Sequence, residues 1–279
     1  MIIDGIADLH VHGAPSLMPR HGPDHEVVGA HAAAGVRFAV LKAHEGSTAE
    51  RAALAAAHEA TAGVEVVGGI VLNSPVGGAN PDAVGVAAQL GARVVWMPTV
   101  SAPAHRAAST SSELAVHSHL AFREVPVLDD AGAVRPEWRD VFDVVAAHDM
   151  VLASGHLSCT EALTVFRAAH EAGVRRLLVN HPRMPFLRWD DAAAPEFAAL
   201  DAHLELGILP DILSDGPPSP TLGAVHPAAL LAFGGDLGHA DHPTLARALP
   251  GWLAGLEEVV GAKAAEEILT RNGRELVVA

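Results

Sequence analysis

The sequence predicts an α/β protein, a (β/α)8 barrel of the TIM type formed by a single domain over residues 1–279. Short runs of β-branched and apolar residues alternate with alanine-rich helical stretches along most of the chain, and glycines repeatedly stand just before the apolar runs. No linker, low-complexity tract or repeated segment breaks this alternation. A chain of 279 residues also has a suitable length for one barrel of this type.

Eight runs have the length and composition of strands. In chain order they cover residues 2–11, 36–43, 64–72, 93–98, 150–154, 176–180, 203–208 and 230–235. Two of the intervening helices begin with a predicted capping box, Ser47 with Glu50 and Ser158 with Glu161. Strands that are separated by helices become parallel neighbours, so eight of them predict a closed barrel.

One segment after the fourth strand departs from the alternation. Residues 99–135 are rich in Ser, Thr, His and Pro, and residues 125–134 have the pattern of a hairpin that turns at residues 129–132. In a barrel, the loops that follow the strands lie on the face that carries the active site. We therefore expect an insertion near residues 105–135 that forms a lid or rim over that face.

Charge and composition restrict the partners of the chain. Lys and Arg total 18 and Asp and Glu total 33, so the net charge is −15, which argues against nucleic acid or an anionic membrane as a partner. The first residues form no basic leader, and no apolar run has the length of a membrane span. The single cysteine, Cys159, fits a reducing compartment. We expect a soluble cytoplasmic protein that acts on a small molecule and pairs with a second copy, if at all, through its outer helices.

The first strand ends in two histidines, His10 and His12, separated by one residue. Successive side chains of a strand point to opposite faces, so both imidazoles are expected on one face, with Leu9 and Val11 on the other. Two imidazoles held in parallel by a rigid backbone can share one transition metal. A strand with chance histidines is the alternative, because the chain contains 18 of them.

Further polar residues stand where the other strands end. Parallel strands of a barrel all end on the same face, so these side chains would converge in space. They are Lys42 and His44 after the second strand, Asn73 after the third, Thr99 after the fourth, His156 after the fifth, His181 after the sixth and Asp236 after the eighth. Imidazole and carboxylate ligands suit zinc first, with manganese, iron and cobalt also compatible.

This ordered set resembles the amidohydrolase superfamily, whose pattern is His-x-His on strand one, one histidine after each of strands five and six, and an aspartate after strand eight. The match runs along nearly the whole chain, and residues 268–276 are similar to the asparagine-containing segment that often closes these barrels. The resemblance implies a metal-dependent enzyme. The metal ligands that it implies are His10, His12, His156, His181 and Asp236, with Lys42 as a further candidate.

The resemblance also implies a mechanism. A metal-activated water would attack an amide, cyclic amide, ester or lactone carbonyl of a small molecule. Asp236 would take the proton of that water and return it to the leaving group. His181 would bind a second metal or, in a one-metal site, hydrogen-bond the water or the oxyanion.

The sequence departs from the superfamily pattern at the ligand that bridges two metals. A carboxylated lysine or a glutamate from strand three or four usually supplies the bridge, but here those strands end in Asn73 and Thr99. Either the site holds one metal, or a carboxylated Lys42 bridges two. Only Lys42 and Lys263 are lysines among the 18 basic residues, which favours a role for Lys42 that arginine could not fill.

Candidate substrate contacts surround this set. Arg20 and Arg183 follow strands one and six and would bind a substrate carboxylate through forked hydrogen bonds. His44, Asn73 and His239 are further candidates, and His44 could instead be an additional metal ligand.

Two other interpretations stay open. Some one-metal barrels of the superfamily are decarboxylases, and others with a similar site are deaminases. A non-catalytic metal-binding scaffold is the alternative from a different class, against which the acid Asp236 argues, because a structural site needs no base at its mouth.

Overall fold

A computed structural model describes residues 3–109 and 122–278 of the chain. Eight strands form one parallel sheet in chain order, with neighbouring strands paired from the first to the eighth. They are β1 (Ile6–Val11), β2 (Val36–Leu41), β3 (Glu65–Val71), β4 (Ala92–Trp96), β5 (Val151–Ala153), β6 (Arg176–Val179), β7 (His203–Leu206) and β8 (Leu231–Phe233). A parallel bridge from Val11 to Leu237 joins β1 to the segment that follows β8, so the sheet closes into a barrel. The predicted (β/α)8 fold is confirmed, and each strand is shorter than predicted.

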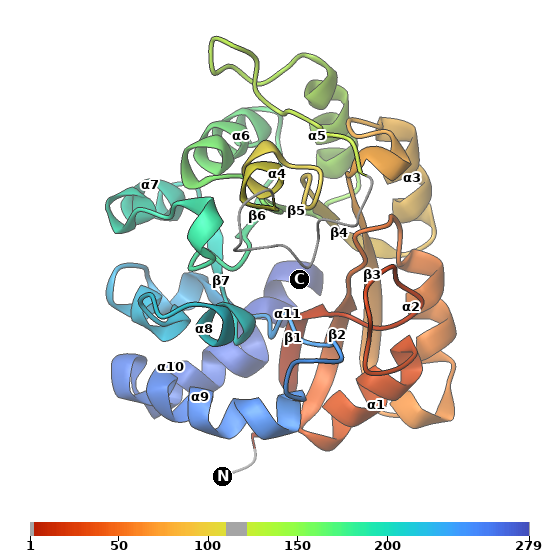
Figure 1. Ribbon diagram of the computed structural model, residues 1–279, viewed down its shortest axis with the longest axis vertical. Helices are drawn as coiled ribbons and strands as arrows, with labels where there is room; N and C mark the ends of the chain where they lie inside the picture. Colours follow the sequence, from red (N-terminus) through yellow and green to blue (C-terminus); the bar gives the residue numbers. More distant parts are fainter. Residues whose placement is uncertain (1–2, 110–121, 279) are drawn as a thin grey trace.

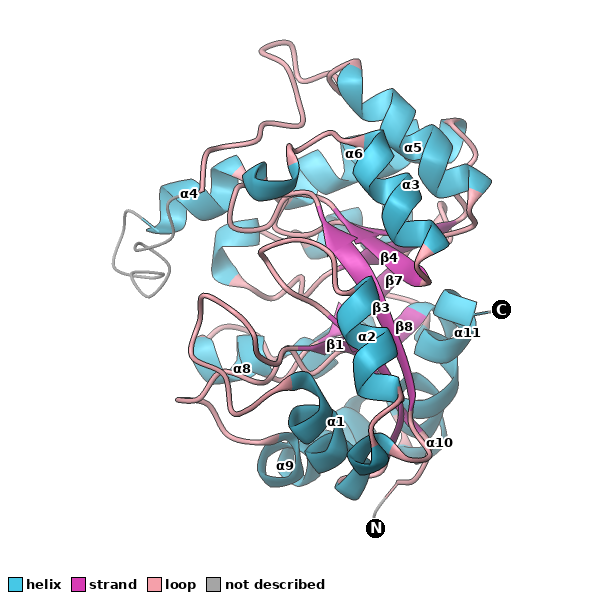
Figure 2. Ribbon diagram, turned by 90° about the vertical axis from the view of Figure 1, so that its right-hand side faces the viewer, coloured by secondary structure: helices cyan, strands magenta, loops and turns pink. Residues whose placement is uncertain are grey.

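Helices surround the strands (Figure 1). They are α1 (Asp24–Ala33), α2 (Ala49–Ala56), α3 (Pro81–Gln89), α4 (Pro103–Ser109), α5 (Glu137–Ala147), α6 (Cys159–Glu171), α7 (Ala194–Ala198), α8 (Leu209–Leu213), α9 (Leu245–Val260), α10 (Ala262–Glu267) and α11 (Gly273–Val278). Figure 2 shows α4 on one side of the strands and α11 on the other, next to the C-terminus. None of the helices in the described ranges combines the length and hydropathy that crossing a bilayer would require.

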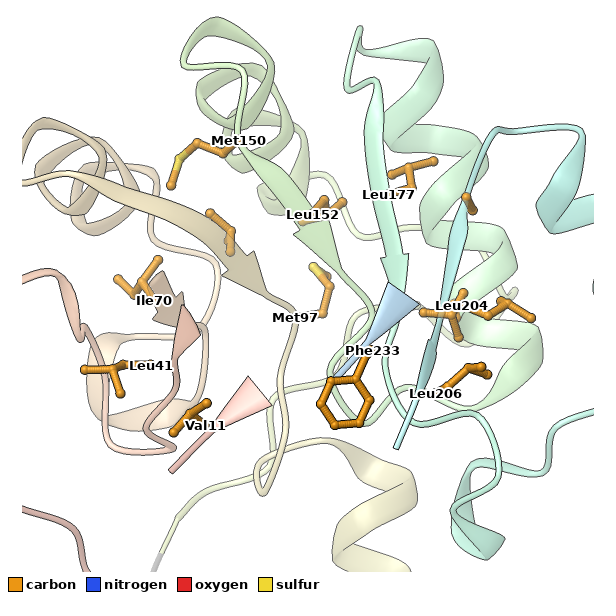
Figure 3. Packing of buried hydrophobic residues seen from close by; sticks show 14 of the residues in the cluster. Val11, Leu41, Ile70, Met97, Met150, Leu152, Leu177, Leu204, Leu206 and Phe233 are labelled. Carbon is orange, nitrogen blue, oxygen red and sulfur yellow. The ribbon is translucent and has the colours of Figure 1, made fainter. Parts of the chain in front are cut away.

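The buried apolar residues form two layers. The outer layer packs between strands and helices and includes Val11, Met97 and Phe233 (Figure 3). The inner layer joins apolar residues of β1 to β6 and β8 to Leu276 and Val277 of α11. Apolar side chains from strands on all sides of the barrel can contact one another only in its interior. Because Leu276 and Val277 join this interior layer, α11 closes the end of the barrel opposite the loops that follow the strands.

One prediction about β1 is wrong. The sequence pattern predicts Leu9 on the same face as Val11, but Leu9 belongs to the inner layer whereas Val11 belongs to the outer layer. The pairing of β1 with β2 shifts its register between Asp8 and Val11, and this irregularity interrupts the simple alternation of faces.

The two predicted capping boxes have different outcomes. In α6, Ser158 Oγ accepts a hydrogen bond from the backbone N–H of Glu161, and Glu161 Oε2 accepts one from that of Ser158, as predicted. In α2, Thr48 occupies the cap position instead of Ser47, and its hydroxyl donates to the Leu41 carbonyl, 2.7 Å away. Thr48 therefore ties α2 to β2 rather than capping the helix.

The insertion after β4 contains the predicted turn, but only in a reduced form. An isolated antiparallel bridge joins Leu128 to Val134, and Asp129 N–H donates to the Ala133 carbonyl at 2.8 Å. A bridge replaces the expected pair of hairpin strands. The predicted lid at residues 105–135 includes residues 110–121, which lie outside the described part of the chain, so the lid stays a prediction.

Candidate metal centre

His10, His12 and Asp236 meet where β1 and β8 lie side by side. His10 Nε2 is 3.1 Å and His12 Nε2 is 3.2 Å from the same atom, Asp236 Oδ1. All three residues are buried, and one ligand atom from each lies within 4.8 Å of the others. Two imidazole nitrogens and a carboxylate oxygen are a donor set that zinc and neighbouring transition metals prefer. The residues present therefore fit a divalent metal ion.

The far side of each imidazole is fixed by a hydrogen-bond acceptor. His10 Nδ1 is 2.9 Å from Glu205 Oε1, and His12 Nδ1 is 2.9 Å from the Lys42 carbonyl oxygen. Because a carboxylate and a carbonyl only accept, each ring donates its Nδ1 proton to that partner, and Nε2, the nitrogen that faces Asp236, is the atom that would bind a metal. This is the arrangement in which an outer partner orients a metal-binding histidine.

Glu205 was not predicted as a site residue. It is fully buried in β7 and accepts hydrogen bonds from the His10 ring, from Asn180 Nδ2 at 2.8 Å and from the backbone N–H of His181 at 3.2 Å. Burial acts to raise the pKa of Glu205, but the facing His10 holds that pKa below its ordinary value. The only sequence signal was an acid inside a short apolar strand.

The charge state of Asp236 follows from the same neighbours. Burial acts to raise its pKa, but the neighbouring His10 and the hydrogen bond from His12 hold it well below the usual range of a carboxyl group. Asp236 has a φ of 53° and His181 a φ of 28°, values that residues other than glycine rarely adopt. Backbone strain of this kind often accompanies functional sites.

Lys42 reaches the same centre from the end of β2. Its Nζ is 2.9 Å from His10 Nε2 and 5.7 Å from the centre of the Trp96 ring, and the side chain is buried. Burial lowers the pKa of Lys42 to about 8. A lowered pKa increases the fraction of the neutral amine, which is the form that carboxylation requires.

The other predicted histidines extend the centre into a cluster of rings. His181 lies 5.5 Å from His10 and 5.1 Å from His156 between ring centroids, and His44 lies 5.3 Å from His12. Burial lowers the pKa of His181 to about 4, and the pKa of His156 far below its ordinary value, so both rings are neutral.

The structure does not bring His156 into the group formed by His10, His12 and Asp236. Its Nδ1 instead lies 2.8 Å from Nδ1 of His105, a buried residue of α4 whose ring stacks on that of His156. Sequence reasoning missed His105 because it lies in the insertion, outside the strand ends.

Two predicted substrate contacts, Asn73 and His44, have internal partners. Asn73 donates to the His44 carbonyl and to Thr99 Oγ1 and accepts from the backbone of Thr99 and Ser101, so its amide group has a full set of partners. His44 Nδ1 is 2.8 Å from the same Thr99 hydroxyl. These contacts hold the ends of β2, β3 and β4 together.

The two predicted arginines differ in their partners. Arg183 forms an ion pair with Asp191 at 2.9 Å and donates to Thr221 at 3.0 Å. Arg20 instead lies beside the centre, with its Nη2 3.3 Å from His12 Nδ1. His239, in the loop after β8, pairs with the backbone of Arg20.

A model of one protein family, described as a family of unknown function, DUF6282, matches residues 5–205 of this chain. A search of curated proteins finds no match in sequence.

Several solved structures have a similar fold. One is a probable 2-pyrone-4,6-dicarboxylic acid hydrolase from Acinetobacter baumannii with citric acid bound, 13% identical, with a TM-score of 0.60 over 98% of this chain and 99% of that one. Another is a 2,6-dihydroxybenzoate decarboxylase from Rhizobium, 13% identical, with a TM-score of 0.57 over 98% of each chain. A third is an amidohydrolase from Pseudomonas aeruginosa, 11% identical, with a TM-score of 0.59 over 98% of this chain and 95% of that one. At these identities the likeness concerns the fold.

Proposed function

The chain belongs to the DUF6282 family, and for it we propose a metal-dependent hydrolase of the amidohydrolase superfamily that cleaves a C–N, ester or lactone bond of a small molecule. The observation that carries the proposal is the approach of His10 Nε2 and His12 Nε2 to one oxygen of Asp236. The similar folds of an amidohydrolase and a pyrone hydrolase add support.

His10, His12 and Asp236 would hold the ion, for which we propose zinc first. A bound divalent ion supplies a Lewis acid and lowers the pKa of water toward neutrality. Lys42 is a further candidate ligand as a carbamate, and the added mass of one CO₂ on the intact protein is its test.

The residues of the chain supply the rest of the chemistry. Asp236 is deprotonated and can accept a proton from the attacking water, then donate it to the leaving group. His181 is neutral, and its buried Nδ1 has no partner among the described residues, so it can hydrogen-bond the substrate. Glu205 keeps the His10 ring in place.

The test uses protein purified without chelator and a panel of amides, cyclic amides, esters and lactones. We expect turnover on at least one class. Asp236→Asn, assayed at a metal content matched to the wild type, should lose at least about 100-fold in kcat, because general acid–base groups contribute about 10² to 10⁴. A fully loaded wild type without turnover on any class, or an equally active variant, would overturn the proposal.

A decarboxylase is the second candidate. Within the described ranges, the one group of three metal-ligand side chains would hold one ion, and a decarboxylase shares the fold. Release of CO₂ from carboxylated aromatic compounds, with one metal per chain, would favour this reaction over hydrolysis.

A further inference from the structure

Arg20 is a half-buried cation without a strong acceptor. In the described ranges, 3–109 and 122–278, no carboxylate lies within ion-pair distance of its guanidinium group. Its Nη2 faces His12 Nδ1 at 3.3 Å and Met18 Sδ at 3.6 Å, and its Nε is buried with no partner. The His12 Nδ1 proton is directed at the Lys42 carbonyl, so that nitrogen cannot accept from Arg20. A thioether is only a weak acceptor.

His239 places a second unused donor beside Arg20. The two residues form an antiparallel backbone bridge, and Ala240 N–H donates to the Pro19 carbonyl, so the loops after β1 and β8 lie against each other. The backbone N–H of Asp241 donates to His239 Nδ1 at 3.2 Å, which assigns the ring proton to Nε2. His239 Nε2 is buried and has no partner in the described part of the chain.

Glu45 is the acid whose charge most favours the Arg20 cation, but it forms no ion pair with Arg20, and its Oε2 is buried with no partner in the described part of the chain. Its Oε1 accepts from Ser16 Oγ at 2.9 Å and from the backbone N–H of Leu17 at 2.6 Å. Glu45 therefore orders the loop that carries Arg20 without neutralising the guanidinium group by direct contact. Two buried donors, one of them permanently charged, are costly without an acceptor, and an anion would satisfy both.

The rest of the molecule gives no general attraction for anions. The net charge is −15, so a negatively charged ligand would be held by local groups rather than by the overall field. Arg20 contacts one edge of the His12 ring, while the opposite nitrogen of that ring faces Asp236. A group bound by Arg20 would thus lie one imidazole away from the reacting centre.

We propose that Arg20 and His239 form a receptor for a carboxylate group of the substrate, which makes the substrate a carboxylated amide, ester or lactone. This inference rests on the proposed function for the identity of the scissile bond. The carboxylate would accept a forked pair of hydrogen bonds from Arg20 and one from His239 Nε2–H. Binding by these donors would orient the bond to be cleaved toward Asp236.

The test measures succinate binding by calorimetry to the protein as purified and to a chelator-treated sample. Arg20→Met should weaken succinate binding by about 10- to 100-fold in both samples, because charge-assisted hydrogen bonds contribute about 1.5 to 3 kcal/mol. His239→Leu should weaken it less, by about 5- to 10-fold, because it removes one neutral donor. Arg247→Met removes the same charge from the exposed face of α9 and should leave binding within twofold.

Three results would overturn the proposal. One is succinate affinity that Arg20→Met leaves unchanged. The second is binding that chelation alone abolishes, because the metal would then be the receptor. The third is tighter binding of inorganic phosphate than of succinate, which would change the ligand class. If Arg20→Met does not fold, Arg20→Lys is the second variant. It keeps the positive charge but cannot form two parallel hydrogen bonds to a carboxylate, and it should still weaken binding by about 10-fold.

This binding test separates the inference from the proposed function. Succinate binding that depends on Arg20, without turnover on any panel substrate, would support the receptor and reject the hydrolase. Turnover with a KM that Arg20→Met does not change would support the hydrolase and reject the receptor.

Discussion

Individual residues determine whether the candidate metal centre is ready to bind an ion. The Nε2 atoms of His10 and His12 face Asp236 because Glu205 and the Lys42 carbonyl accept the protons on the other side of the rings. Glu205 also binds the segment at His181 through two further hydrogen bonds. The acid is therefore expected to act through the ligands rather than on the substrate.

Glu205→Gln tests this positioning role. The amide keeps the shape of the side chain but replaces one acceptor oxygen by a donor, so it cannot satisfy all three donors around it. We expect zinc affinity to fall by about 10- to 100-fold, as for other outer partners of metal-binding histidines. Competition with a chromophoric chelator measures the affinity.

Glu65→Gln is the matched control, since Glu65 is exposed and pairs with Arg274 on the surface. Equal zinc affinity of Glu205→Gln and Glu65→Gln would show that Glu205 does not position the ligands.

His203 provides a pH-dependent prediction at the start of β7. Burial lowers its pKa to about 4, against an ordinary value of about 6.5. Between these values the unfolded chain binds a proton that the folded chain does not, so stability that is present above pH 6.5 is lost as the pH falls toward 4. The loss from this residue is about 2 kcal/mol at pH 5.

Urea denaturation at pH 7 and pH 5 measures this loss. The free energy of unfolding of His203→Gln should fall less between the two pH values than that of the wild type. Parallel changes in the two proteins would contradict the pKa given for His203.

The sequence indicates the central residues of the candidate metal centre, but it does not indicate Glu205 and His105. His10, His12 and Asp236 end neighbouring strands, and barrel closure alone brings such residues together. Glu205 and His105 were missed because one is an acid inside a strand and the other lies in an insertion, where no periodicity indicates direction. The face of Leu9 was wrong because a register shift cannot be seen in a pattern of period two.

At the scale of elements, the turn after β5 fixes the approach of His156. Gly155 has a φ of +59°, and a Cβ at this position would lie 2.2 Å from the Met97 carbonyl oxygen. Both the left-handed conformation and the close backbone contact require glycine here.

Gly155→Ala should therefore destabilise the protein by at least about 2 kcal/mol, through strain and displacement of β4 from β5. Gly251→Ala is the control, because Gly251 lies in α9 with open space around its Cα and should gain about 0.5 to 1 kcal/mol. Chemical denaturation measures both. A Gly155→Ala protein as stable as the wild type would contradict the described turn.

Strands were easier to predict than the helix starts and the insertion. An apolar run of four to eight residues can be predicted as a strand from the run itself, because the barrel buries both faces of each strand. The start of α2 is instead determined by a tertiary contact. Thr48, and not Ser47, occupies the cap position, and its hydroxyl donates to the Leu41 carbonyl of β2. The insertion offered polar residues without a period, and only its turn at Asp129 could be predicted.

At the scale of the whole molecule, the barrel is a rigid frame that brings a few distant side chains to one point. α11 and the inner apolar layer close one end, so the candidate site lies at the other end, where the strands terminate. An ion that binds the folded chain alone also stabilises the frame by mass action. Metal content and fold stability are therefore expected to change together.

Elemental analysis of protein purified without chelator shows whether His10, His12 and Asp236 hold a metal ion. We expect at least one equivalent of a transition metal per chain in the wild type, with zinc first, and its loss in His12→Ala together with a lowered melting temperature. Wild-type protein that carries no transition metal and takes none up, or His12→Ala protein with unchanged metal content, would contradict this expectation.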